Sequence, residues 1–157
     1  MTAKVNIAGH PVHPMLVAFP IGLWVFSLAC DIVFRATGNA VWDTVALYTM
    51  GGGIIGAVAA ALPGFFDLLD MKESAAKRIG LGHALLNIAA LVLFVASFSV
   101  RQSAGPGTVP FILSILGVIT IMVSGWLGGS MVYLHGAAVE LGQPQAGEPP
   151  REWKKAA

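Results

Sequence analysis

Charged side chains are scarce in this sequence. Lys, Arg, Asp and Glu make up 11% of its 157 residues, and the formal net charge is +1. In soluble globular proteins about a quarter of the residues are charged, so the composition argues against a soluble domain. No basic run of the kind that binds nucleic acid is present, and no nucleic-acid partner is expected.

Cysteine and catalytic motifs are also sparse. The single cysteine, Cys30, excludes an internal disulfide. The sequence has no G-x-S-x-G elbow, no H-E-x-x-H pair and no phosphate-binding loop, which excludes the common hydrolase and nucleotide-binding signatures. It also lacks C-x-x-C-H, so a haem would be bound non-covalently. Whether the protein is an enzyme stays open, and an electron carrier is favoured over a hydrolase or a transferase.

Apolar residues, in contrast, are abundant. They account for 56% of the chain, and the mean hydropathy is +0.77. Four stretches reach the roughly 20 residues that cross about 30 Å of hydrocarbon as a helix. These stretches are 15–34, 44–69, 81–100 and 109–134. The sequence therefore predicts an all-α membrane protein, a bundle of four transmembrane helices over residues 1–141, followed by a flexible cytoplasmic tail over 142–157.

Lysine and arginine are distributed unevenly around these stretches, and they favour cytoplasmic loops. Seven lie before the first stretch, between the second and third, or in the tail: Lys4, Lys72, Lys77, Arg78, Arg151, Lys154 and Lys155. Only Arg35 and Arg101 lie on the other side. This bias predicts an integral protein of a bacterial-type inner (plasma) membrane, with the N and C termini both in the cytoplasm.

The four histidines, His10, His13, His83 and His135, all fall at the predicted cytoplasmic ends of the helices. Asp67 closes the second helix on the same side. Four-helix bundles build cofactor and metal sites from side chains on facing helices. Proline follows His13, so this residue is expected to cap its helix in a non-helical conformation.

Small and polar residues accompany these histidines. Asn87 lies one turn beyond His83, and Gly128 shares a helix face with His135. In the second helix, small residues recur every fourth position: Gly52, Gly56, Ala60 and Gly64. Such a row predicts close helix packing. It also offers a flat face for a planar ring near Gly64, and glycine seams allow a homo-oligomer.

Asp31 stands apart from this group, near the non-cytoplasmic end of the first helix. We expect it to pair with Arg35 one turn further on, as an i,i+4 ion pair. No role in the main site is assigned to it.

Two motifs resemble a known family. The chain reads GHPVHPMLVAFPIG from Gly9 to Gly22, and GWLGG from Gly125, followed by Tyr133, His135 and Gly136. Together they resemble the family of small four-helix membrane proteins catalogued as domain of unknown function 2231, over nearly the whole chain up to about residue 141. The resemblance implies the fold more than the chemistry. Some relatives look fused to cytochrome c-like or Rieske-like modules, so the resemblance implies that the domain works beside redox modules.

Three functions are consistent with these features. In the first, the protein is a redox protein that holds haem b between His83 and His135, with His13 as substitute ligand and Asn87 and Asp67 orienting the imidazoles. Its electron partner would be a protein or a quinone in the lipid bilayer.

In the second, His13, His83, His135 and Asp67 hold a zinc, copper or iron ion for metal sensing or transport. In the third, the bundle is a cofactor-free structural or interaction protein.

Overall fold

Four long helices make up most of the computed structural model, which describes residues 3–137. They are α1 Val12–Thr37, α2 Ala40–Asp70, α3 Ala75–Ala104 and α4 Thr108–His135. All four are long and apolar enough to cross a membrane, as the sequence predicts. Each extends beyond its predicted apolar stretch at both ends. Hydropathy marks only the segment that suits hydrocarbon, whereas the helices continue into polar ends.

Short connections keep neighbouring helices antiparallel. Gly38 ends α1 in the left-handed conformation, with φ 69°, and the side chain of Asn39 then caps α2 by accepting from the Val41 amide. Ser74 caps α3 in the same way, accepting from the Lys77 amide at 3.2 Å. These are the residue types that end and begin helices.

A small hairpin precedes the first helix. Strands β1 (Asn6–Ile7) and β2 (His10–Pro11) pair antiparallel, with Ile7 opposite His10. The two turn residues, Ala8 and Gly9, both have positive φ, 51° and 83°. Positive φ at both central residues is the requirement of a type I′ turn. The segment leads directly into α1.

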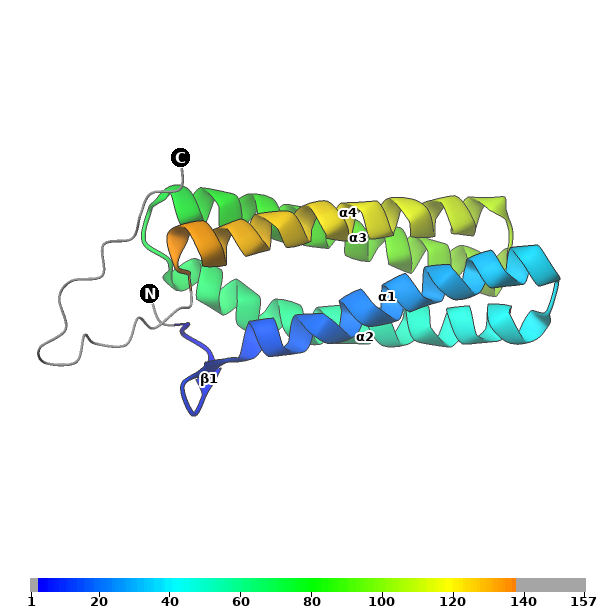
Figure 1. The fold of residues 1–157 in the computed structure, drawn as a ribbon, viewed down its shortest axis with the longest axis horizontal. Coiled ribbons are helices and arrows are strands. Elements are labelled where there is room, and N and C mark those ends of the chain that lie inside the picture. The colour runs from blue at the N-terminus through cyan, green and yellow to red at the C-terminus, as the bar shows by residue number, and fades with distance from the viewer. Residues whose placement is uncertain (1–2, 138–157) are drawn as a thin grey trace, which may run out of the picture.

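The helices form two antiparallel hairpins, α1 with α2 and α3 with α4 (Figure 1). The start of α1 and the end of α4 lie at the same end of the bundle. Large apolar side chains are exposed along the outside of all four helices; examples are Phe19, Ile55, Leu85 and Met122. An apolar exterior suits lipid, where only internally satisfied backbones are stable.

At the centre of the bundle, the two hairpins meet through a pair of aromatic rings. Trp24 of α1 stacks on Phe94 of α3, with ring centroids 4.1 Å apart and an interplanar angle of 11°. Both side chains are buried. Each ring also lies on a glycine of its own hairpin, Gly53 under Trp24 and Gly117 under Phe94, where a Cβ would come within 2.4 Å and 2.7 Å of the ring. Glycine is therefore what lets both rings reach the centre.

The row of small residues on α2 packs against α1. An added Cβ would lie 3.4 Å from Leu23 at Gly52 and 3.3 Å from Pro20 at Gly56. At Gly64 it would meet the ring of His13. This row is thus a packing surface between two helices of the same chain, α2 and α1.

The two hairpins repeat one another in sequence. Residues of α1 have counterparts in α3 exactly 70 positions later: His13 and His83, Trp24 and Phe94, Ser27 and Ser97, Asp31 and Arg101. Residues of α2 have counterparts in α4 64 positions later: Ala46 and Pro110, Gly53 and Gly117, Ala60 and Ser124, Gly64 and Gly128. The repeat extends to hydrogen bonds, since Ser27 Oγ donates to Ala46 O at 2.7 Å and Ser97 Oγ to Pro110 O at 2.8 Å.

Counterparts also contact each other across the bundle. His13 faces His83, Trp24 stacks on Phe94, and Asp31 pairs with Arg101. A residue meets its own counterpart only at a two-fold axis. The bundle therefore has a pseudo-two-fold axis between α1 and α3, parallel to the helices, as in parallel membrane repeats.

Candidate functional site

Two histidines, one from each hairpin, meet at the end of the bundle that carries the N-terminal segment. His13 lies in the first turn of α1 and His83 in the third turn of α3. Their ring centroids are 6.2 Å apart, and the ring planes are at 87°. Both residues are half-buried. We call these two residues the histidine pair.

Each ring of the pair is fixed by a backbone carbonyl of the second helix of its hairpin. Nδ1 of His13 lies 2.8 Å from the oxygen of Ala60, and Nδ1 of His83 lies 2.8 Å from the oxygen of Ser124. Because a carbonyl only accepts, Nδ1 carries the proton in both rings. In the neutral imidazole, the lone pair is then on Nε2.

These two carbonyls are not at the end of a helix, where carbonyls lack a helical partner. Ala60 and Ser124 lie inside α2 and α4, so their oxygens accept the imidazole proton within continuous helices. A glycine follows each one four positions later, Gly64 and Gly128, and leaves room for the ring. A Cβ would come within 2.6 Å of the His13 ring and 3.1 Å of the His83 ring. The sequence singles out both glycines, and the structure places an imidazole against each.

We expect Gly64→Ala to lower the free energy of unfolding by about 1–3 kcal/mol, the usual cost of overpacking. The new methyl group would displace the His13 ring from the Ala60 carbonyl. Gly125→Ala is the control, because nothing lies within 4 Å of a Cβ there. Alanine also favours a helix over glycine by about 1 kcal/mol. The measurement is thermal unfolding in detergent by circular dichroism, and equal melting temperatures for both variants would contradict the close packing at Gly64.

His83 has further polar partners. The amide nitrogen of Asn87 lies 3.0 Å from Nε2 and also donates to the His83 carbonyl at 2.9 Å. Ser124 Oγ lies 3.0 Å from Nδ1 and donates to the His83 carbonyl at 3.2 Å. Asn87 thus contacts the imidazole at Nε2. Ser124, for which the sequence predicts no role, contacts the ring at Nδ1.

The predicted ligands His135 and Asp67, and the fourth histidine, His10, lie elsewhere. His135 is the last residue of α4 and is exposed, and His10 is exposed in β2 with Nδ1 3.1 Å from the Ala8 carbonyl. Asp67 accepts the Val5 amide at 2.9 Å and so holds the N-terminal segment. Within residues 3–137, no three His, Cys, Asp or Glu side chains are arranged to hold a metal ion. The four residues of the predicted metal set are thus not assembled.

One local expectation for His13 is wrong. The residue is helical, because α1 begins at Val12 and Pro11 is the residue before it. A residue before proline prefers an extended backbone. Here the hydrogen bond between the His13 ring and the Ala60 carbonyl outweighs that preference. Pro14 still falls within the first turn, where its missing N–H leaves no bond unmade.

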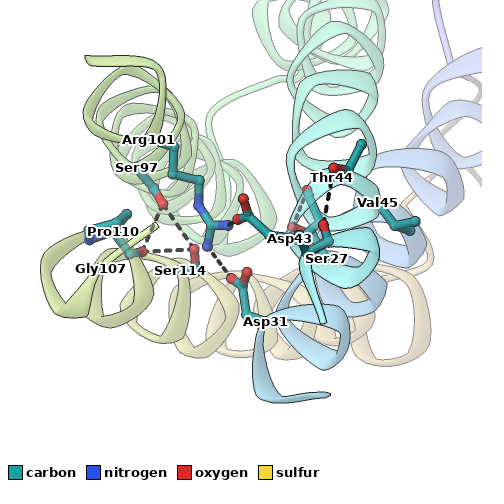
Figure 2. A network of polar contacts seen from close by, with 12 residues as sticks. Ser27, Asp31, Asp43, Thr44, Val45, Ser97, Arg101, Gly107, Pro110 and Ser114 are labelled. Carbon is teal, nitrogen blue, oxygen red and sulfur yellow. Dashed lines mark hydrogen bonds and ion pairs between the residues drawn. The ribbon is translucent and has the colours of Figure 1, made fainter. Parts of the chain in front are cut away.

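A second polar cluster lies near the C-terminal ends of α1 and α3, away from the histidine pair, and Figure 2 shows its contacts. The guanidinium of Arg101 forms ion pairs with Asp31 and, at 3.2 Å, with Asp43. The Asp31 and Arg101 side chains are 3% and 4% exposed. Beside them, the hydroxyl oxygens of Ser97 and Ser114 lie 3.0 Å apart, and both hydroxyls donate to the Pro110 carbonyl. We call Asp31, Asp43 and Arg101 the ion-pair cluster.

This cluster corrects the prediction for Asp31. Its partner is Arg101 of α3, not Arg35 on the next turn. Arg35 instead lies over the ring of Phe111, 4.5 Å from its centroid, and donates to the Gly107 carbonyl. The i,i+4 rule identifies local partners only. The signal for Arg101 is in the repeat: H-x10-W-x2-S-x3-D from His13 and H-x10-F-x2-S-x3-R from His83.

The fold and its apolar exterior define a four-helix integral membrane protein built from two similar hairpins. The chain belongs to the family described as predicted membrane protein, domain of unknown function 2231, whose model matches residues 9–141. That range includes both histidines of the pair and the whole ion-pair cluster. No curated protein and no solved structure matches the sequence.

Proposed function

We propose that the protein is a membrane-embedded redox protein that binds haem b non-covalently through the histidine pair and passes electrons within the membrane. The observation that carries the proposal is the symmetric presentation of His13 and His83. Each comes from one hairpin, and each is fixed through Nδ1 to a backbone carbonyl. Histidines that bind metals commonly donate their second ring N–H in this way, which sets the tautomer and raises the basicity of the ligand nitrogen.

The spacing of the rings is also suitable. With a metal–nitrogen bond of about 2.0–2.1 Å, each imidazole centroid would lie roughly 3 Å from an ion that both rings held, so the two centroids would be up to roughly 6 Å apart. The observed separation of 6.2 Å fits that span. His135 does not present an alternative of this kind, because it lies exposed at the end of α4.

Asn87 is the residue that has to release the ligand nitrogen. Its amide donates to Nε2 of His83, but it also donates to the His83 carbonyl. A neutral hydrogen bond contributes only about 1 kcal/mol net. The amide can therefore give up the ring and keep its bond to the backbone.

The remaining residues would position and tune the group. Gly64 and Gly128 keep Cβ atoms away from the imidazole rings, and the Ala60 and Ser124 carbonyls hold their orientation. When bound, haem supplies a one-electron iron couple whose potential depends on its axial ligands, hydrogen bonds and burial. From the charge bias around the helices, we expect this end of the bundle to face the cytoplasm. A redox protein or a quinone would exchange the electron there.

The test is the absorption spectrum of the full-length protein purified in mild detergent, before and after dithionite, with elemental analysis of the same sample. A Soret band that shifts on reduction supports the proposal. A colourless, folded protein with stoichiometric zinc, copper or iron would replace haem by a metal ion. A folded protein with neither would leave the structural role.

A further inference from the structure

The pseudo-two-fold axis raises the question of why the two hairpins pair with each other. Any hairpin that contacts its own counterpart across an axis can in principle contact a second copy of itself, from another chain. Two of the three contacts across the axis pair similar side chains, histidine with histidine and tryptophan with phenylalanine. Neither contact distinguishes the pairing of a first hairpin with a second hairpin from the pairing of two first or two second hairpins.

The third contact does distinguish them. Asp31 and Arg101 are counterparts, yet they have opposite charges. Two first hairpins would place Asp31 against Asp31, and two second hairpins would place Arg101 against Arg101. These side chains are 3% and 4% exposed, so water would screen little of either repulsion.

Asp43 strengthens this asymmetry. It supplies Arg101 with a second carboxylate from α2, while the counterpart of Asp43 in α4 is Gly107. Two first hairpins would therefore bring four carboxylates to the axis. Two second hairpins would bring two guanidinium groups and no carboxylate. The exposed Arg35 would not resolve this, because it is directed to Phe111 and Gly107 of the other hairpin.

We propose that the ion-pair cluster is a pairing-specificity device: it selects the association of the first hairpin with the second and rejects a second copy of the same hairpin. Opposite charges that favour one partner and penalise another are the usual means of such discrimination. The histidine pair and the aromatic stack pack the two hairpins together, and the contact between Asp31 and Arg101 makes the pairing selective. The partner rejected is the same hairpin of a second copy of this chain.

The test uses full-length chains with reversed charges. Asp31→Arg and Arg101→Asp each place like charges on the axis, and the combined D31R/R101D variant restores opposite charges in exchanged positions. Glu73→Arg is the control reversal, because the Glu73 side chain is 85% exposed and its ion pair with Lys77 is of the surface kind that contributes about 0–1 kcal/mol. Melting temperature and oligomeric state in detergent are measured for each variant. We expect both single reversals to lose the wild-type melting transition and the combined variant to regain most of it.

The decisive arm is co-expression of D31R and R101D chains with different affinity tags. Exchange of hairpins between the two chains gives every half an oppositely charged partner. We expect these chains to co-purify as a one-to-one dimer well above the level of two wild-type chains, even where each variant alone fails to fold. Single reversals as stable as wild type, a combined variant as damaged as the singles, or co-purification at the wild-type level would each overturn the proposal.

Discussion

Replacing His13 or His83 by alanine is expected to abolish the Soret band that the proposed haem would give, while His10→Ala and His135→Ala leave that band unchanged. The reason is geometric: only the first two rings face each other, at 6.2 Å, with Nδ1 of each ring fixed. The measurement is the Soret absorbance per protein after purification from haem-supplied cells. The four variants are matched, since each removes one imidazole.

Two outcomes would contradict this assignment. Loss of the band in His135→Ala with retention in His13→Ala would establish the pair expected from sequence, His83 with His135. Retention in all four variants would exclude histidine ligation altogether. Circular dichroism must show the same helix content as the wild type, because a misfolded bundle would lose the band for unrelated reasons.

A large loss of stability is also expected from Arg101→Leu. Removing the guanidinium leaves Asp31 buried and unpaired, with Asp43 beside it. Loss of one partner of a buried ion pair costs about 3–5 kcal/mol. For a protein of this size, where 1 kcal/mol shifts the melting temperature by about 2–4 °C, the expected decrease is on the order of 10 °C.

The double variant D31L/R101L is the control for this prediction. It removes both buried charges, and well-packed apolar replacements of a buried pair are often close to neutral. We therefore expect the second substitution to recover much of the stability lost in the first. Thermal unfolding in detergent gives both values. A double variant less stable than Arg101→Leu would show that Asp31 does not need a counter-ion.

The fold was readable from the sequence because hydropathy over some 20 residues reports directly on the lipid environment. The four helices and their short connections follow from that signal and from residues such as Asn39 and Ser74, which cap helices. The distribution of lysine and arginine predicts the orientation of the protein in the membrane, and this orientation stays a prediction. Arg101 was counted among the residues outside the cytoplasm, but it belongs to a buried ion pair and not to a loop.

The site was readable only in part. Topology correctly brings His13 and His83 to one end of the bundle, but it does not fix the rotation of a helix about its axis. For that reason, it could not distinguish His13, which faces His83, from His135, which is exposed. The ion-pair cluster could not be found from local spacing, because its partners lie on three helices. Comparing the sequence with itself at an offset of 70 residues would have pointed to its central pair, Asp31 and Arg101.

The aromatic stack between the two polar ends has a consequence for the membrane itself. Trp24 lies about 16 Å along α1 from His13 and about 10 Å from Asp31, at 1.5 Å per residue. Its ring and that of Phe94 close the centre of the bundle, packed with Met50, Ala90 and Ile121. Protons need a chain of water or polar groups to move, and this apolar layer interrupts one. The protein can thus carry titratable groups at both ends of its interior without a path for protons that joins them through the bundle.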